Sequence, residues 1–295
     1  MTGGPGPLGP GTLTIERPGA QTLVEDLGRP GLAHLGVPAS GALDRGALAL
    51  ANRLVGNPDH AAALEIVMGG FRARVDAETW FAVTGAWGDV RLDGRRIAPY
   101  TAARATAGAV LELGTPDRGI RYLLAFRGGL EVPPVLGSRS RDTLSGIGPE
   151  PLRAGDVLPI GAEPAASVPL LDREAAFPPP AGAVTLALLP GPRADRFTDA
   201  AHRTLYERPW RMSEQADRIG ARLTGDALER LIPGELPSEA TVPGSMQVAG
   251  DGRPTILLAD RPVTGGYPVI AVVSAASLDR LAQVRPGQEV RFRHA

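Results

Sequence analysis

Four short stretches of the sequence bring arginine together with aspartate or glycine. Arginine presents a planar fork of N–H donors that binds carboxylate and phosphate groups, and adjacent glycines let the backbone approach a ligand closely. These stretches are therefore candidate binding sites for an anionic small molecule. The candidate residues are Asp26 and Arg29 in "EDLGRPG", Arg139 in "GSRSRD", Asp217 and Arg218 in "ADRIG", and Asp260, Thr264, Gly265, Gly266 and Tyr267 in "ADRPVTGGYP".

The same stretches also suit structural roles. "EDLGRPG" and "TGGYP" are typical of tight turns, and "GSRSRD" is typical of a solvated loop. Asp217 and Arg218 are also compatible with an internal ion pair that holds a corner of a β-barrel. The sequence leaves these alternatives open and assigns no catalytic residue.

A fifth stretch, "SGALDRG", places Asp44 and Arg45 at the start of a helical apolar pattern. Ser40 suits the N-cap of this helix and Gly56 suits its C-terminal cap. The spacing Ser-x-x-x-Asp-Arg recurs at 213–218. We therefore add Asp44 and Arg45 to the candidate binding residues. We expect the two copies to line one cleft, either between two similar units or against a partner chain.

Several kinds of chemistry are excluded by residues that the sequence lacks. The chain contains no lysine, so it cannot form a Schiff base, supply a P-loop lysine or carry biotin on its own side chain. It contains no cysteine, which removes thiol catalysis, disulfides and cysteine-ligated metals. The four histidines, His34, His60, His202 and His294, show no metal-ligand spacing, and we expect no metal site.

Charge and hydropathy restrict the partners. The chain has 31 basic and 32 acidic residues, a formal net charge of −1, which does not supply the positive field that nucleic-acid binding needs. No run of 18 apolar residues is present, so we expect no membrane span. The start "MTGGPGPLGPG" lacks the basic and apolar regions of a secretory signal, and we expect a cytoplasmic protein.

The elements that would position these residues are short strands. The 38 glycines and 29 prolines separate many β-favouring runs, such as "TLTIE", "WFAVTG", "DVRLDG", "AVLELG", "RYLLAF", "YPVIAVVS" and "EVRFR". This pattern predicts a mainly β protein with few short helices. We divide it into a flexible Gly/Pro tail at 1–11, a first β unit at 12–164, a linker at 165–182 and a second β unit at 183–295.

The two units share motifs in the same order. "TLTIERPG" matches "VTLALLPG", the Ser-x-x-x-Asp-Arg copies follow, "GGLEVPPVLGSRS" matches "GGYPVIAVVSAAS", and "LRAGDVL" matches "VRPGQEV". Four weak matches in one order are stronger than any of them alone. The sequence therefore predicts an internal duplication that produces two related β units.

The stretches 21–57 and 246–268, with "RGGLEVPPVLGSRSRDTLSGIG" and "SEQADRIGARLTGD" between them, resemble the allophanate hydrolase subunit 2-like family. This family is also called the biotin-dependent carboxyltransferase subdomain A/B family. The resemblance extends from about 12 to 292. Two details depart from its pattern: "ADRPVTGGYP" has Arg-Pro-Val where relatives often have other polar residues, and "SGIGPEPL" lacks one glycine.

The resemblance implies cyclophilin-like β-barrel units and a role in a complex. It implies the C component of an ATP-dependent 5-oxoprolinase, which converts 5-oxo-L-proline to L-glutamate while ATP is hydrolysed to ADP and phosphate. The implied partners are a KipI-like B component and a LamB/YcsF-like A component. The implied cofactor is ATP, bound somewhere in the complex. The resemblance also raises the candidacy of Asp26, Arg29 and 264–267 as binding residues.

Two other functions are compatible with the same resemblance. One is a carboxyltransferase component, as in urea carboxylase, where carboxybiotin on a carrier domain donates its carboxyl group; the biotin would then belong to a partner. The other is a KipA-like regulator without catalysis, which binds a kinase-inhibitor partner. The lack of lysine does not separate these functions, because the biotin carrier would be another chain.

Overall fold

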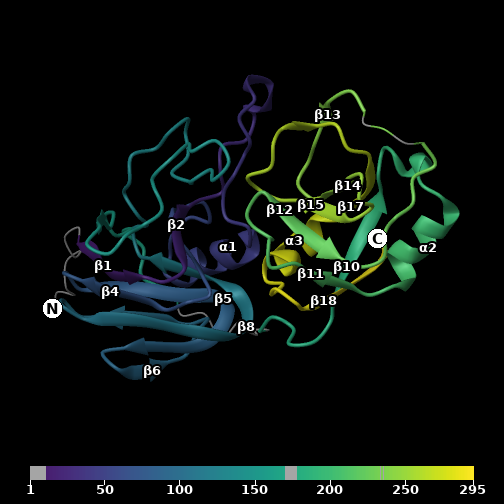
Figure 1. Ribbon diagram of the computed structural model, residues 1–295. Coiled ribbons are helices and arrows are strands. Elements are labelled where there is room, and N and C mark those ends of the chain that lie inside the picture. The colour runs from purple at the N-terminus through teal and green to yellow at the C-terminus, as the bar shows by residue number, and fades with distance from the viewer. Residues whose placement is uncertain (1–10, 170–177, 233, 235) are drawn as a thin grey trace. The chain divides into compact units, whose positions relative to one another are not determined.

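The computed structural model describes residues 11–169, 178–232, 234 and 236–295 (Figure 1). The described residues form two compact units that are not contiguous in sequence. The first unit contains the described residues of 1–28, 44–141 and 147–179, and the second contains those of 29–43, 142–146 and 180–295. The tail at 1–10 and the centre of the predicted linker, 170–177, lie outside the described residues.

The first unit is built on one large, antiparallel sheet. Strands pair in the order β2-β3-β8-β4-β1-β9, and β5 extends the sheet through its pairing with β6, β7 and β8. The strands are β1 (Thr12–Pro18), β2 (Gln21–Glu25), β3 (Ala63–Val67), β4 (Phe71–Val75), β5 (Thr79–Leu92), β6 (Arg95–Ile97), β7 (Ala102–Ala105), β8 (Val110–Phe126) and β9 (Val157–Pro159).

Two strands of this sheet are longer than the sequence pattern suggests. "WFAVTG" and "DVRLDG" are parts of the single strand β5, and "AVLELG" and "RYLLAF" are parts of β8. Glycines interrupt the apolar pattern, but the ladder between β5 and β8 continues past them through shifts of register between Gly85 and Val90. Such bulges bend a strand without ending it. The continuously apolar stretch 122–126 is fully buried, as its composition predicts.

A helix covers part of this sheet. Helix α1 (Arg45–Leu54) begins after Asp44, whose carboxylate accepts a hydrogen bond from the Ala47 N–H at 2.9 Å. The predicted N-cap at Ser40 is therefore wrong. Ser40 and Gly41 have positive φ values of 56° and 91°, a left-handed conformation that keeps them outside the helix. At the other end, Gly56 takes φ 74° just after the helix, as predicted.

The second unit is a closed barrel with strand order β10-β17-β14-β15-β12-β11-β18. Each strand is short and pairs with two neighbours, so the barrel has no open edge. The strands are β10 (Val184–Pro190), β11 (Trp210–Met212), β12 (Gly220–Thr224), β14 (Ser245–Val248), β15 (Pro254–Leu257), β17 (Val269–Val273) and β18 (Glu289–His294).

Smaller elements complete this unit. The unit also contains the α-helices α2 (Asp199–Glu207) and α3 (Ala275–Ala282) and the 3-10 helices η1 (Ala33–Leu35) and η2 (Ala194–Arg196). A separate two-stranded sheet pairs β13 (Glu239–Ala240) with β16 (Thr264–Gly265). The described residues contain three α-helices in all, so the expected mainly β architecture is confirmed.

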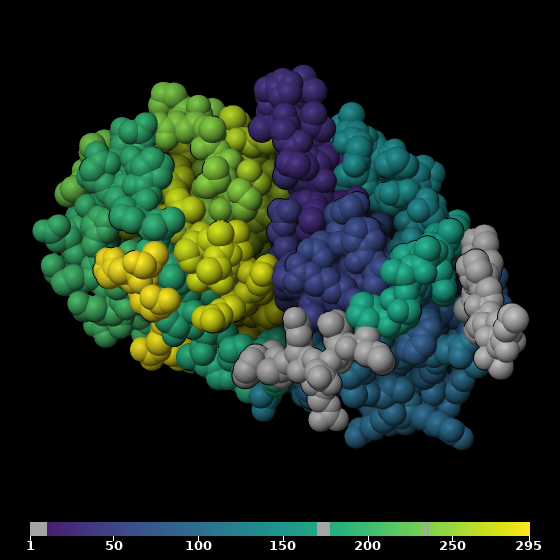
Figure 2. All heavy atoms as spheres, turned by 180° about the vertical axis from the view of Figure 1, so that it is seen from behind, coloured from purple at the N-terminus to yellow at the C-terminus, as the bar shows by residue number. Residues whose placement is uncertain are grey.

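The barrel core includes a residue from the first part of the chain. Trp210, Met246 and Val290 are fully buried in the core, and Leu43 packs with them. Leu43 ends a segment whose tip at η1 is exposed and stands out from the surface as the dark purple column in Figure 2. None of the helices in the described part of the chain is both long and apolar enough to cross a bilayer.

The paired motifs of the two units occupy different elements. In the first copy Asp44 and Arg45 begin α1, whereas in the second copy Asp217 and Arg218 lie in a turn before β12. The first copy continues into the helix-forming run "GALALANRL". In the second copy, "GARLT" pairs along β15 as a strand instead. Local sequence similarity at these positions therefore does not carry the same secondary structure.

Candidate functional site

The stretch "ADRPVTGGYP" lies between barrel strands β15 and β17 and contains the short strand β16. Two backbone hydrogen bonds hold it against the segment 236–241: Thr241 N–H donates to Val263 O at 2.9 Å, and Leu236 N–H donates to Gly266 O at 2.8 Å. The stretch is therefore a fixed part of the second unit.

Asp260 is the centre of a buried polar cluster. Arg218 Nε lies 2.9 Å from Asp260 Oδ2, and Arg218 Nη2 lies 3.1 Å from Oδ1. The Ser40 hydroxyl donates to Oδ1, while the Thr143 N–H and hydroxyl donate to Oδ2 at 3.0 and 2.8 Å. Arg218 Nη2 also donates to Gly41 O at 2.7 Å. We call these five residues the Asp260 cluster.

The carboxylate of Asp260 remains ionised in this cluster. Burial alone would raise its pKa, because Asp260 has no exposed surface. The charge of Arg218, with hydrogen bonds from Arg218, Ser40 and Thr143, outweighs burial and holds the pKa below its usual range. Both oxygens accept several hydrogen bonds, so the carboxylate is unsuited to accept a proton. Through Asp260, the cluster joins the segments that contain Ser40, Thr143 and Arg218.

Arg261, the next residue, has a different environment. Its side chain is 7% exposed, and Nη2 donates to Thr241 O at 3.2 Å. Within the described part of the chain, Arg261 Nε and Nη1 have no hydrogen-bond acceptor. Burial lowers the pKa of this arginine. A buried guanidinium with unfilled donors is a group that can bind an anion.

The rest of the stretch reaches the surface. Thr264 is exposed, and Tyr267 is 40% exposed, with its carbonyl 3.4 Å from Gln247 Nε2. A Cβ on Gly265 would lie 2.5 Å from Gln247 Nε2, and one on Gly266 would lie 3.0 Å from a backbone oxygen. Both glycines thus have a packing reason.

In the first unit, Asp26 contacts the loop that contains Arg139. The contact is through backbone: Arg139 N–H donates to Asp26 Oδ2 at 2.7 Å, and the hydroxyls of Ser138 and Ser140 donate to Oδ1 at 2.6 Å each. The guanidinium of Arg139 instead pairs with Glu131 at 2.9 Å. Ser138 and Ser140 are buried, so "GSRSRD" is a structured loop and not a solvated one.

Three other predicted residues take part in local structure. Asp44 caps α1 and Arg45 beside it is exposed. Asp217 accepts hydrogen bonds from Ile219 N–H at 2.8 Å and Gly220 N–H at 2.9 Å, and its side chain is 46% exposed. Arg218 pairs with Asp260, and Asp217 Oδ2 lies 3.9 Å from Arg222 Nη1. That the two copies line one cleft stays a prediction.

Arg29 is also buried, at 2% exposure, and belongs to the second unit with the rest of the segment 29–43. Its backbone N–H donates to Ala39 O at 2.7 Å, which closes the base of the segment 29–43. The sequence places Arg29 in the same motif as Asp26, but the two residues are assigned to different units.

Sequence reasoning missed several members of the site. Thr143 and Gly41 show no motif of their own, and Ser40 was assigned a different role. Thr241 contributes through its backbone oxygen, which any residue type provides. Closeness along the chain is one signal that could have found two of them, because Thr143 directly follows "GSRSRD" and Gly41 lies inside "SGALDRG". The described residues contain no cluster of three or more acidic or histidine side chains suited to a metal.

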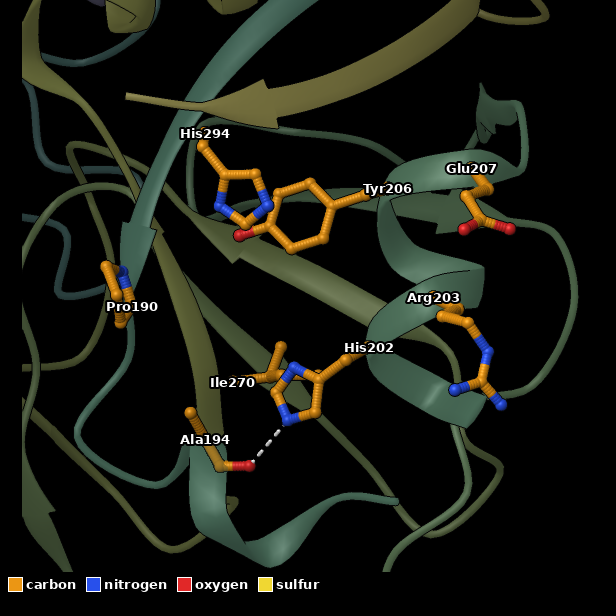
Figure 3. A pocket seen from close by; sticks show the side chains of 8 residues that line it. All are labelled: Pro190, Ala194, His202, Arg203, Tyr206, Glu207, Ile270 and His294. Carbon is orange, nitrogen blue, oxygen red and sulfur yellow. Dashed lines mark hydrogen bonds between the residues drawn. The ribbon is translucent and has the colours of Figure 1, made fainter. Parts of the chain in front are cut away.

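A separate hollow of about 470 Å³ lies beside α2 in the second unit (Figure 3). Tyr206 stacks on His294 with ring centroids 3.9 Å apart, and a nitrogen of His202 lies 2.9 Å from Ala194 O. Figure 3 shows Glu207 pointing away from the stacked rings. This hollow contains none of the predicted binding residues.

The family described as the carboxyltransferase domain, subdomain A and B, matches residues 35–294. The chain is 39% identical over 283 residues to the C component of 5-oxoprolinase from Escherichia coli, a match that covers 95% of this chain and 90% of that protein. It is 31% identical to the urea amidolyase of Saccharomyces cerevisiae, covering 96% of this chain but only 16% of the yeast protein.

A solved structure shares the fold. The crystal structure of TTHA0988 matches with a TM-score of 0.85 and 40% sequence identity. The match covers 96% of this chain and 56% of that one, so the present chain corresponds to little more than half of TTHA0988. The sequence match and the structural match therefore both cover nearly the whole of this chain.

Proposed function

This chain belongs to the carboxyltransferase domain, subdomain A and B, family, and we propose that it acts as the C component of an ATP-dependent 5-oxoprolinase. The observation that carries the proposal is the identity of 39% to the E. coli protein over 95% of this chain and 90% of its relative. A match along nearly the whole length of both chains is expected of an equivalent component. The complex would convert 5-oxo-L-proline to L-glutamate and hydrolyse ATP.

The proposed reaction needs groups that bind anions, and this chain offers such groups. A lactam resists attack by water, and transfer of the ATP γ-phosphoryl group to the lactam oxygen would activate it. The second unit offers a buried cation at Arg261 and a rigid cluster around Asp260, whose carboxylate is saturated with donors. In this proposal these groups bind and position the reactants. The groups that transfer protons would come from other chains, a KipI-like B component and a LamB/YcsF-like A component.

The test is reconstitution. The chain is co-expressed with its candidate A and B components, and the purified complex is supplied with 5-oxo-L-proline and ATP. We expect glutamate and ADP only when all three chains are present. Preparations that lack one chain each serve as controls, and a catalytically competent complex without this chain would contradict the proposal.

A carboxyltransferase function is the second candidate, and the match to yeast urea amidolyase favours it. Because this chain has no lysine, the biotin would have to be attached to another protein. We would probe the purified complex with streptavidin and assay transfer of a carboxyl group to urea. A co-purifying biotinylated chain with urea-dependent turnover, and no release of glutamate, would favour this function. A complex with neither activity would favour a regulator.

A further inference from the structure

The buried arginines of this protein differ in how fully their donors are used. Arg218 is 2% exposed and donates to both oxygens of Asp260 and to Gly41 O. Arg127 is 4% exposed and donates to the backbone oxygens of three residues, Val55, Pro164 and Ala166. For Arg218 and Arg127, the fold therefore supplies several acceptors to a buried guanidinium.

Arg261 is the contrasting case. It is buried to a similar degree but makes one long hydrogen bond, 3.2 Å, to Thr241 O. Its Nε and Nη1 have no acceptor within the described residues. The neighbouring carboxylate of Asp260 is already paired with Arg218. A charge that is removed from water without a counter-ion destabilises a fold, so a purely structural explanation does not account for Arg261.

We propose that Arg261 binds the carboxylate of the small substrate, the cyclic amide acid of the function proposed above, on which this inference rests. A single cation without an acidic partner in the described structure matches a single carboxylate. A nucleotide triphosphate carries several charges and is usually bound by several cations or by a nest of backbone N–H groups. Exclusion of water around Arg261 would strengthen a charge-assisted hydrogen bond to the ligand.

The segment that follows Arg261 reaches the surface within six residues. Thr264 is exposed three residues later, and Tyr267 is partly exposed beyond the two glycines. Two backbone hydrogen bonds to the segment 236–241 hold this segment in place. Arg261 therefore lies in a fixed part of the backbone, close along the chain to exposed residues.

The experiment compares Arg261→Met, which keeps most of the side-chain length, with Arg261→Lys, which keeps a charge. Arg280→Met, on the exposed last turn of α3, is the matched control. In the reconstituted complex we expect Arg261→Met to raise KM for 5-oxo-L-proline about 10- to 100-fold, the effect of losing a hydrogen bond to a charged group. We expect Arg261→Lys to raise it less, and KM for ATP to stay within about twofold of wild type in both variants.

A binding measurement separates this inference from the proposed function. Calorimetry without ATP would compare 5-oxo-L-proline with 2-pyrrolidinone, which has the same ring but no carboxylate. We expect Arg261→Met to abolish the preference for the acid and to leave pyrrolidinone binding unchanged. If Arg261→Met loses the preference for the acid but the wild-type complex shows no turnover, only the proposed function is refuted. Normal binding and KM in an active Arg261→Met complex would refute only this inference.

Thermal unfolding of the same variants tests whether Arg261 only supports the fold. Because Arg261→Met removes a buried charge that lacks a carboxylate partner in the described structure, we expect its Tm to equal or exceed that of wild type. A fall of Tm together with equal weakening of acid and pyrrolidinone would mean that Arg261 supports the fold. A rise in KM for ATP alone would assign the guanidinium to phosphate and overturn the proposal.

Discussion

Asp260 and Arg261 are adjacent in the chain and both are buried, but their side chains differ in how many hydrogen-bond partners they have. The carboxylate of Asp260 accepts hydrogen bonds from Ser40, Thr143 and Arg218. The guanidinium of Arg261 retains two donors without an acceptor in the described structure. Buried polar groups are normally satisfied, and the exceptions point to function or strain. At the scale of single residues, Asp260 therefore stabilises and Arg261 is available to bind.

Replacing Asp260 by asparagine tests its structural role. The Asp260→Asn variant keeps the shape of the side chain but removes the negative charge that pairs with the buried Arg218. We expect the free energy of unfolding to fall by about 3–5 kcal/mol, the usual effect of breaking a buried pair. Urea denaturation measures it. Asp226→Asn, at an exposed position, is the control and should change stability by less than about 0.5 kcal/mol.

The same pair predicts how stability depends on pH. The pKa of Asp260 is lowered in the fold, whereas in the unfolded chain it is about 3.9. Its stabilising contribution is therefore complete above that ordinary value and is lost as the pH falls through the lowered one. Wild type should lose stability with acid more steeply than Asp260→Asn. Parallel acid curves for the two proteins would show that the ion pair contributes nothing.

At the scale of elements, helix α1 shows how one side chain sets a boundary. The carboxylate of Asp44 accepts the N–H of Ala47, and the left-handed residues Ser40 and Gly41 precede it. The hydroxyl of Thr84 in β5 donates to Ala47 O at 2.7 Å, which joins the first turn of the helix to the sheet. The cap and this bond together position α1 on the first unit.

Removal of the cap should destabilise the first unit. We expect Asp44→Ala to lower the free energy of unfolding by about 1 kcal/mol, since a helix N–H loses its acceptor. Asp44→Asn, which keeps a capping oxygen, should lose less than half of that. Denaturant unfolding followed by circular dichroism measures both. Equal losses in the two variants would mean that charge, and not capping, is what stabilises.

At the scale of the molecule, the second unit is assembled from three parts of the chain. The segment 29–43 supplies Ser40 and Gly41 to the Asp260 cluster and Leu43 to the barrel core, and the segment 142–146 supplies Thr143. A unit built in this way depends on residues that a contiguous C-terminal fragment does not contain.

A fragment that contains only 180–295 should therefore be less stable than the same unit in the whole chain. It loses the donors of Ser40 and Thr143 to a buried carboxylate. Addition of a synthetic peptide of residues 29–43 should raise its Tm with peptide concentration. The same peptide with Ser40→Ala should raise it less. A fragment with full stability, indifferent to the peptide, would contradict this dependence.

Much of the architecture could be predicted from the sequence. The strands at 12–18, 184–190 and 289–294 coincide with predicted β runs, because alternation and β-branched residues act locally. The mainly β class and the helix at 45–54 follow from the same local patterns. The lengths of β5 and β8 could not be predicted, because pairing across the sheet carries both strands through their glycines.

The sequence by itself determined which chemistry this chain cannot perform, which residue types it offers to an anion, and where most strands lie. The tertiary structure alone decided how those residues are used. Ser40 lies 220 positions from Asp260 and Thr143 lies 117 positions from it, so closure of the second unit brings them together. That closure pairs Asp260 with Arg218 and leaves Arg261 with two donors that no described residue accepts, a difference that two adjacent letters cannot show.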